Sequence, residues 1–119
     1  MPKPEREFTD STILPWSPVE MGVMEKVLAE DPETGDKTRL VRFPPGYEGR
    51  EVKIHDYWEE IYVLDGYFED ITLDCKFPAG SYACRPPGMT HGPFRTPLGC
   101  TALEILYGNR NIAGGLHTR

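Results

Sequence analysis

The sequence predicts an all-β domain of about eight short strands, arranged as an antiparallel sandwich or barrel with a jelly roll among the leading candidates. Apolar and polar residues alternate in short runs, as they do along half-buried strands. Clusters rich in glycine and proline separate these runs at regular spacing, and the chain contains twelve residues of each type. A length of 119 residues corresponds to a single domain that can bury a core without metal or disulfide bonds.

The first twenty residues contain four prolines, too many for a helix, and are expected to form an extended arm. Apolar members such as Trp16 predict that this arm packs against other parts of the protein. Residues 21–29 and the alternating run 38–43 flank a turn cluster at 31–36, which predicts a hairpin. A helix over 19–30 is disfavoured because the segment has no clean apolar stripe and no glycine at its end.

Further strands are expected over 50–55, 59–64, 67–73, 81–84, 91–95 and 100–107. The Asp65-Gly66 pair is read as the turn between the second and third of these strands. The tail from Gly108 onward is rich in glycine and asparagine and is expected to fray. The predicted organisation is therefore an arm over 1–20, a barrel over 21–107 and a tail over 108–119.

Charge and composition exclude several classes of function. Thirteen basic against nineteen acidic side chains give a net charge of −6, which argues against nucleic acid or an anionic membrane as the main partner. The sequence has no apolar run of ~18 residues and no secretory signal, so a cytoplasmic protein is expected. Three cysteines without paired spacing are expected to be reduced thiols (Cys75, Cys84 and Cys100).

Two segments carry the candidate chemistry: Lys53-x-His55-x3-Glu59-x6-Gly66 and Gly80-x5-Pro86-x-Gly88-x2-His91. Strand alternation points Lys53 and His55 to the same side, and a short loop then delivers Glu59 to the neighbouring strand. A sharp bend at Pro86-Pro87-Gly88 then leads to His91 at the head of the next strand. If the two segments lie opposite each other, two imidazoles and one carboxylate converge, a ligand set that suits Fe, Mn, Ni or Zn.

Both segments resemble the two signature motifs of the cupin superfamily of small jelly-roll barrels. The first motif is matched at His55, Glu59 and Gly66; the second at Gly80, Pro86, Gly88 and His91, with Arg95 in place of the final asparagine. Within the superfamily, the run from Glu59 to Asp70 and the turns after it are most similar to the cupin domain of ChrR-type anti-sigma factors and its stand-alone relatives. The resemblance covers roughly residues 38–107. It implies a single-domain cupin, a double-stranded β-helix.

Lys53 stands where the motif has its first histidine. A protonated ammonium has no lone pair and cannot bind a metal ion. One alternative is a three-ligand site of His55, Glu59 and His91. The other is a site without metal, in which the Lys53 cation pairs with Glu59, and Lys53, Glu59 and His91 perform acid–base catalysis on a carbonyl compound.

Five further residues are candidates for the substrate pocket: Tyr57, Trp58, Tyr82, Arg95 and Glu104. Tyr57 and Trp58 belong to the rim, and Arg95 is expected to be a rim or surface cation. Glu104 has either an interior or a solvent-facing position, and solvent is preferred. Tyr82 lines the pocket if its strand face is inward and supports a dimer if that face is outward.

Val52 and Ile54 lie on the strand face opposite Lys53 and His55 and need a cover of their own. The N-terminal arm or a second subunit would supply it. This favours a homodimer, which the resemblance to single-domain cupins also implies.

Taken together, these features predict a protein that binds a small molecule, and they favour a metal-dependent enzyme. Oxygenation is the reaction class that the resemblance favours most, with isomerase, cyclase or lyase chemistry on a carbonyl compound close behind. Two alternatives stay open: a non-catalytic ligand-binding or sensory cupin, and the metal-free acid–base enzyme that uses Lys53.

Overall fold

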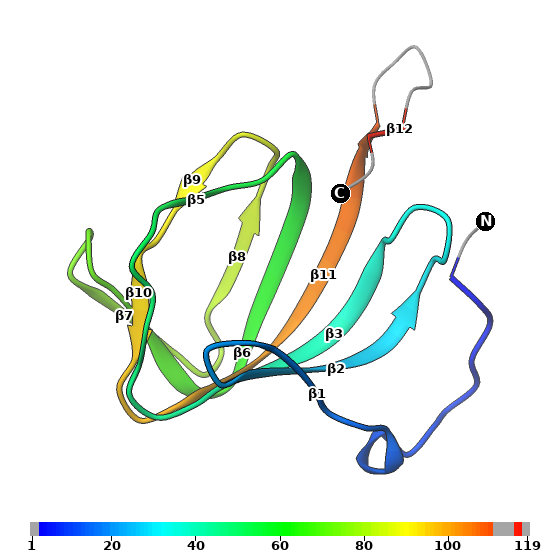
Figure 1. The fold of residues 1–119 in the computed structure, drawn as a ribbon, viewed down its shortest axis with the longest axis horizontal. Helices are drawn as coiled ribbons and strands as arrows, with labels where there is room; N and C mark the ends of the chain where they lie inside the picture. The colour runs from blue at the N-terminus through cyan, green and yellow to red at the C-terminus, as the bar shows by residue number, and fades with distance from the viewer. Residues whose placement is uncertain (1–2, 111–115, 118–119) are drawn as a thin grey trace.

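Strands dominate the computed structural model, which describes residues 3–110 and 116–117 (Figure 1). Its helical content within these residues is one 3-10 turn, η1 (Ser11–Ile13). The strands are β1 (Ser17–Glu20), β2 (Val23–Glu30), β3 (Lys37–Phe43), β4 (Tyr47–Glu48), β5 (Lys53–Ile54), β6 (Tyr57–Asp70), β7 (Cys75–Pro78), β8 (Tyr82–Arg85), β9 (Thr90–His91), β10 (Phe94–Thr96), β11 (Cys100–Arg110) and β12 (Leu116–His117). The predicted all-β class is confirmed.

One antiparallel sheet curls into a half-barrel, with its strands in the order β1-β2-β3-β11-β6-β10-β4 (Figure 1). Strands β7 and β8 pair with β6, and β12 pairs with β11. Strands β5 and β9 form a separate two-stranded ladder that lies across the concave side of the sheet. The interior between this ladder and β6 is the space in which a ligand can be enclosed.

The hairpin predicted near the N-terminus is confirmed as β2 and β3, so the disfavoured helix over 19–30 does not form. Its turn is closed by the backbone of Asp31, whose N–H donates to the carbonyl of Asp36 at 2.8 Å. The Asp31 carboxylate accepts the N–H of Glu33 at 2.9 Å, as an aspartate at the start of a turn does.

The turn predicted at Asp65-Gly66 is wrong, because β6 continues through both residues. The register with β11 shifts here, which marks a bulge that bends the long strand. Gly66 has φ +74°, and a Cβ at this position would lie 2.1 Å from the carbonyl oxygen of Gly99. The chain reverses only after Asp70, whose carboxylate accepts the N–H of Leu73 at 2.8 Å. Gly66 therefore allows β6 to bend, and this bend contributes to the curvature of the sheet.

The strand predicted over 91–95 is divided into β9 and β10 by Gly92-Pro93. Gly92 has φ +77°, outside the extended region, and Pro93 has no N–H to donate to a ladder. The strand predicted over 50–55 is reduced to β5, which pairs Lys53 with His91.

The apolar core occupies one end of the interior. It is formed by side chains from β2, β3, β6 and β11: Val23, Val41, Phe43, Ile61, Val63, Phe68, Cys100 and Ala102. The rings of Phe43 and Phe68 meet edge to face, with centroids 5.0 Å apart, and Phe94 packs on both. The opposite end of the interior contains charged groups instead.

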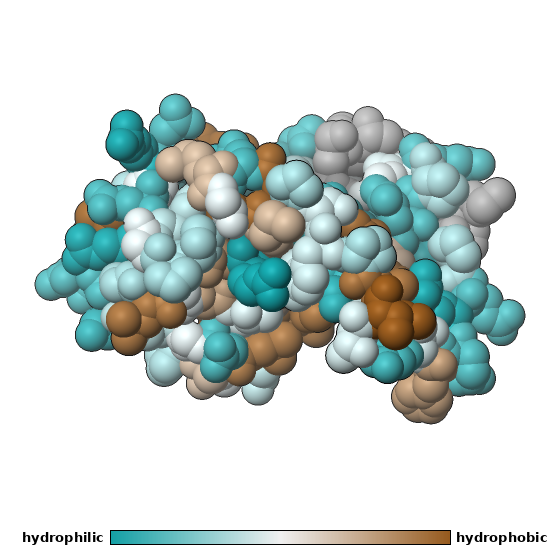
Figure 2. Space-filling model, turned by 60° about the horizontal axis from the view of Figure 1, so that its bottom comes forward, coloured by the Kyte–Doolittle hydropathy of each residue, from teal (hydrophilic) through white to brown (hydrophobic). Residues whose placement is uncertain are grey.

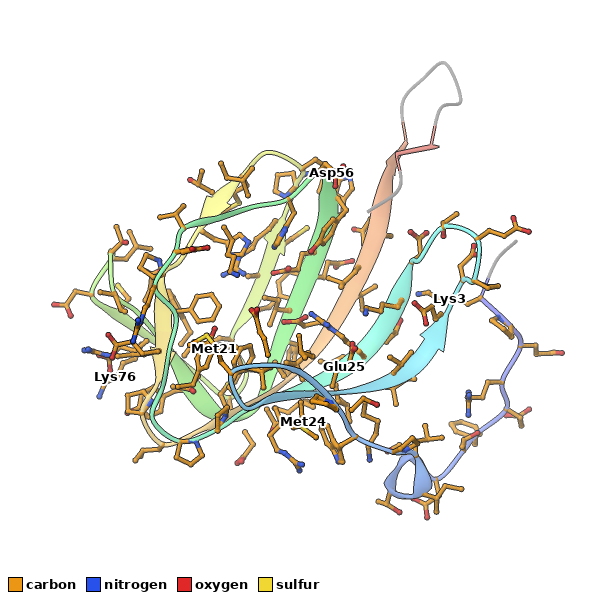
Figure 3. All side chains as sticks on the ribbon, in the orientation of Figure 1. Lys3, Met21, Met24, Glu25, Asp56 and Lys76 are labelled. Atoms are coloured by element: carbon orange, nitrogen blue, oxygen red, sulfur yellow. The ribbon has the colours of Figure 1, made fainter. Side chains whose placement is uncertain are left out.

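The N-terminal arm packs on the outer face of β2 and β3. The Trp16 ring has the Arg42 guanidinium 4.1 Å and the Lys26 ammonium 4.9 Å from its centroid. Near its start, the arm is attached by Lys3, which donates to the Thr38 hydroxyl at 3.0 Å (Figure 3). The expectation that the arm packs on the protein is thus met at these two strands.

The arm does not cover Ile54 of β5 or the preceding Val52, which remain 64% and 56% exposed. Elsewhere, apolar residues form separate clusters among hydrophilic ones, as one face of the molecule shows (Figure 2). Within the residues described, no helix has the length and apolar character needed to cross a membrane.

The predicted boundaries of arm and tail differ in detail from the strands. Residues Ser17–Glu20 form β1 and pair with β2, so the end of the arm belongs to the sheet. Strand β11 runs through Arg110, beyond the expected end of the barrel at residue 107. Most of the predicted tail, at 111–115 and 118–119, lies outside the described residues.

Candidate functional site

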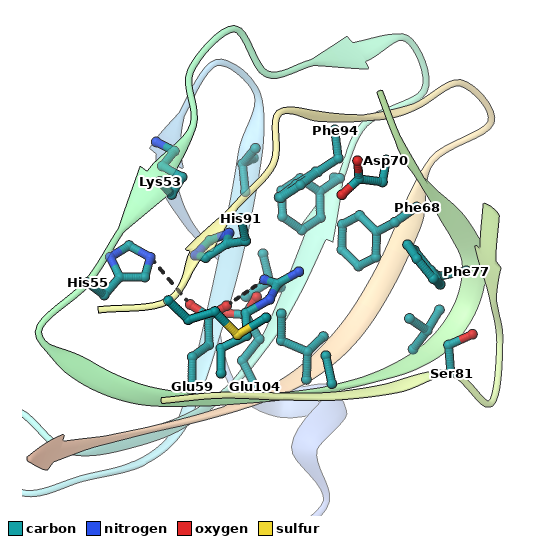
Figure 4. Close-up of a pocket in the computed structure, with 18 of the residues that line it drawn as sticks. Lys53, His55, Glu59, Phe68, Asp70, Phe77, Ser81, His91, Phe94 and Glu104 are labelled. Atoms are coloured by element: carbon teal, nitrogen blue, oxygen red, sulfur yellow. Dashed lines mark hydrogen bonds and ion pairs between the residues drawn. The ribbon is translucent and has the colours of Figure 1, made fainter. Parts of the chain in front are cut away.

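A cavity of about 380 Å³ occupies the concave side of the sheet, beneath the β5–β9 ladder (Figure 4). Its two ends differ in chemistry. Histidines, carboxylates and guanidinium groups line one end, whereas phenylalanines and aliphatic side chains, with the Asp70 carboxylate beside Phe68 and Phe94, line the other. The volume is within the range of pockets that hold small molecules.

His55, Glu59 and His91 converge at the charged end, as the motif spacing predicts. Each offers one ligand atom, and these atoms all lie within 4.8 Å of one another. His55 follows β5, Glu59 belongs to β6 and His91 ends β9, so three separate segments meet here. His55 Nε2 lies 3.6 Å from Glu59 Oε2, and the His55 and His91 ring centroids are 5.0 Å apart.

The two histidines have the protonation state that metal binding requires. Burial, together with the nearby Arg85, lowers the pKa of His91 to about 4. Burial and the Lys53 cation also lower the pKa of His55. Both imidazoles are therefore neutral near pH 7, and a neutral ring has a lone pair to donate to a metal ion.

The His91 ring provides a test of whether the site suits a metal. Both of its nitrogens are buried, and neither has a hydrogen-bond partner among the described residues. Such unsatisfied buried atoms are rare in folded proteins and call for an explanation such as an ion. His55 is held in place by stacking on Tyr57, with ring centroids 4.5 Å apart. These residues fit a divalent metal ion.

Glu59 is paired with Arg85, not with Lys53. Strands β6 and β8 place the two residues opposite each other, and Arg85 Nη1 donates to Glu59 Oε1 at 2.9 Å. The Lys53 ammonium instead lies 3.9 Å from a Glu20 oxygen, and its side chain is 42% exposed. The alternative in which Lys53 neutralises Glu59 is therefore wrong, because another cation already occupies that position.

Glu104 faces the interior, which corrects the preference for solvent. It belongs to β11, the strand between β3 and β6, and lies on the same face as the buried Ala102 and Leu106. Arg39 on β3 donates to its carboxylate twice, at 3.0 and 2.8 Å. Burial raises the pKa of the Glu104 carboxyl, and Arg39 opposes that rise.

The other candidate pocket residues divide between the two faces of the sheet. Tyr57 lines the cavity. Trp58, the next residue along β6, is not part of the lining and stacks on Tyr107, with ring centroids 6.0 Å apart. Strand alternation explains this difference, because Glu59 occupies the inner face between two outward residues.

Tyr82 and Arg95 also point away from the cavity interior. Tyr82 contributes to the lining, yet its side chain is exposed and its hydroxyl donates to Glu60 on the outer face of β6 at 2.5 Å. Arg95 is absent from the lining and pairs with Glu69, its register partner on β6. The structure thus places Arg95 at the surface, as expected, whereas Tyr82 contributes to the cavity lining while its hydroxyl pairs on the outer face.

Two residues of the charged end were not among the candidates from sequence. Arg39 joins Glu104 to Glu25, which it contacts at 3.0 Å, and Arg85 contacts Glu59. Their sequence signal is weak: a basic residue at an inward position of an alternating strand. Recognising it requires the pairing of strands far apart in the sequence, which no local pattern supplies.

The curled antiparallel sheet and the interior histidines and carboxylate define a cupin. Residues 4–106 match the ChrR cupin-like domain family, and the chain belongs to this family. The resemblance found in the sequence is thus confirmed. A search of curated proteins returned no match.

Solved structures share the fold. An RmlC-like cupin from Shewanella frigidimarina has a TM-score of 0.72 and 21% identity, over 89% of this chain and 93% of that one. An acetylacetone dioxygenase from Acinetobacter johnsonii has a TM-score of 0.62 and 19% identity, over 98% and 89%. The complex of Rhodobacter sphaeroides SigE with the anti-sigma factor ChrR contains a chain with a TM-score of 0.61 and 26% identity, over 78% of this chain and 49% of that one.

Proposed function

We propose that this cupin is a metal-dependent enzyme that acts on a small molecule in the cavity. His55, Glu59 and His91 would hold a divalent Fe, Mn, Ni or Zn ion. The observation that carries the proposal is the convergence of their ligand atoms within 4.8 Å around two buried His91 nitrogens that lack partners among the described residues. A bound ion would supply Lewis-acid or redox chemistry, and three protein ligands leave coordination positions open for substrate.

The surrounding residues prepare this site in distinct ways. Tyr57 stacks on His55 and orients the ring. Arg85 holds one oxygen of Glu59 and leaves the other toward His55. The β5–β9 ladder lies across the cavity and positions His91 at its charged end. Oxygenation is the proposed reaction class, supported by similarity in fold to an acetylacetone dioxygenase, with isomerase, cyclase or lyase chemistry next.

The first test is the metal content of protein purified without a chelator or a metal-binding tag. We expect one Fe, Mn, Ni or Zn ion per chain, lost in His91→Ala. The matched control is His117→Ala, which removes the one remaining histidine of the chain. A variant series in which both substitutions leave the metal content unchanged contradicts the assignment of His91, and a wild-type protein that stays metal-free after reconstitution contradicts the proposed function. Oxygen consumption by the iron-loaded protein with small-molecule panels then tests the reaction class.

The second candidate is a non-catalytic ligand-binding or sensory cupin. The family match and the similarity to the complex of SigE with ChrR support it. In this case the protein binds metal and ligand but turns nothing over, and it captures a transcription factor in a pull-down from its own cell extract. A homodimer is proposed for either function, because Val52 and Ile54 remain exposed. Sedimentation velocity measures that state directly.

A further inference from the structure

We propose that the ligand of the cavity is a small monocarboxylic acid with an apolar body. Its carboxylate would lie at the charged end beside Arg85, and its alkyl or aryl group would extend toward Phe68 and Phe94. This inference rests on the proposed metal site and specifies what that site binds.

The first argument is charge. Among the described residues that line the cavity, three are cationic and four are carboxylates: Arg39, Lys53 and Arg85; Glu20, Glu59, Asp70 and Glu104. With all of them ionised, the lining carries one negative charge. A divalent ion reverses this to one positive charge. Buried charge without compensation is costly, so a ligand with a single negative charge suits the loaded site.

The second argument is the geometry of Arg85. Its side chain is only 18% exposed, and Arg85 lines the cavity. A guanidinium has five N–H donors in a planar fork, and the hydrogen bond found for Arg85 uses one nitrogen, Nη1, on Glu59. The fork therefore has donors left that can bind a carboxylate oxygen, and guanidinium groups match planar carboxylates better than point cations do.

The third argument is the apolar wall. Phe68 and Phe94 pack against each other with centroids 5.1 Å apart, and both line the cavity. In Figure 4 these rings lie at the opposite end from His55 and Glu59, with Phe77 beyond Phe68. Ile61 and Val63 line the cavity on the strand between the two ends. An anion with no apolar part would leave this wall in contact with water.

Calorimetric titration tests the inference with two probes of the same shape, 3-phenylpropanoate and its neutral amide, 3-phenylpropanamide. The titrations use protein loaded with Zn²⁺, which has no redox chemistry, so the signal reports binding and not turnover. We expect the acid to bind at least about tenfold more tightly than the amide, equivalent to ~1.4 kcal/mol. Metal-free protein should lose most of this preference, because the lining alone is net negative.

Variants separate the contribution of each end. Arg85→Gln should remove the preference for the acid, whereas Arg95→Gln, on an arginine outside the lining, should leave it intact. Phe68→Leu should weaken the acid and the amide by similar factors. If Arg85→Gln does not fold, the comparison of acid and amide on the wild-type protein still tests whether the cavity prefers a carboxylate.

The outcomes distinguish this inference from the proposed function. Protein that binds Zn²⁺ and prefers the acid supports both. Protein that binds Zn²⁺ but treats acid and amide alike, or binds neither, overturns the inference and leaves the metal site intact. Protein that binds none of Fe, Mn, Ni and Zn overturns both.

Discussion

The site is built from two regions that differ sharply in how firmly they are held. Glu59 and Glu104 lie on β6 and β11, which pair over nine residue positions in the middle of the sheet. His91 belongs to the β5–β9 ladder, which has two residue pairs, and His55 directly follows β5, where Ile54 is exposed. Regions with few buried contacts open at low free energy. The comparison indicates that the sheet fixes the carboxylates, whereas the position of the histidines depends more on what they bind.

The largest loss of folding stability is expected when the Glu104 carboxylate is removed by substitution. Glu104→Ala leaves the half-buried Arg39 guanidinium without its interior carboxylate, although Glu25 remains in contact. Breaking a buried ion pair in this way costs about 3–5 kcal/mol. Urea denaturation monitored by circular dichroism measures the loss. Arg95→Ala, which breaks a pair at the rim whose arginine side chain is 43% exposed, is the control and should cost about 1 kcal/mol.

Gly66→Ala tests the bend in β6. The added Cβ would meet the Gly99 carbonyl oxygen at 2.1 Å, so backbone must move, and we expect a loss of about 2–4 kcal/mol. Gly46→Ala is the matched control, because Gly46 also has a positive φ but has no atom within 4 Å of the added Cβ. Its cost should be only the ~1–2 kcal/mol of a left-handed residue. Equal losses in the same denaturation assay would contradict the role given to the close approach.

Metal binding should stabilise the ladder more than the sheet. A hundredfold excess of free metal over its dissociation constant raises the free energy of unfolding by about 2.7 kcal/mol. Hydrogen exchange should show the larger slowing at residues 53–55 and 90–91, and little change in the middle of β11. Uniform protection across both regions would show that they open together, which would contradict the view that the ladder is held less firmly than the sheet.

The smallest effect is expected in how the folding stability of the metal-free protein depends on pH. The pKa of His91 falls from 6.5 to about 4 on folding. Between these two pH values the unfolded chain is protonated at His91 and the folded protein is not. Stability is therefore full above pH 6.5 and declines as the pH falls toward 4. The loss at pH 5 should be about 1 kcal/mol, allowing for partial exposure to solvent. Thermal melting of wild type and His91→Asn between pH 5 and 7 isolates this contribution.

Local alternation was sufficient for the hairpin of β2 and β3. The convergence of His55, Glu59 and His91 also required the two motif segments to lie opposite each other, which the resemblance to cupins implied. Local patterns were not sufficient for Glu104 or Arg85. Whether Glu104 is buried depends on β11 lying between β3 and β6, and the contact of Arg85 with Glu59 depends on the register of β8 with β6. Both are properties of non-local pairing.

Gly66 shows a different limit of sequence interpretation. Aspartate followed by glycine is a strong turn signal, since glycine tolerates a positive φ. A β-bulge also favours a residue that tolerates a positive φ, so a turn and a bulge at Asp-Gly have the same sequence signature. The close approach of Gly99, more than thirty residues later, decides between them.

The positions of Trp58, stacked on Tyr107, and of Trp16, packed between two cations, allow this protein to be followed by its own fluorescence. The chain contains two tryptophans, one in the N-terminal arm between two cations and one next to Glu59 against Tyr107. Their fluorescence consequently reports on two separate events without any label. With Trp16 replaced by phenylalanine, emission follows the outer face of β6, where Trp58 stacks on Tyr107; with Trp58 replaced instead, it follows detachment of the arm.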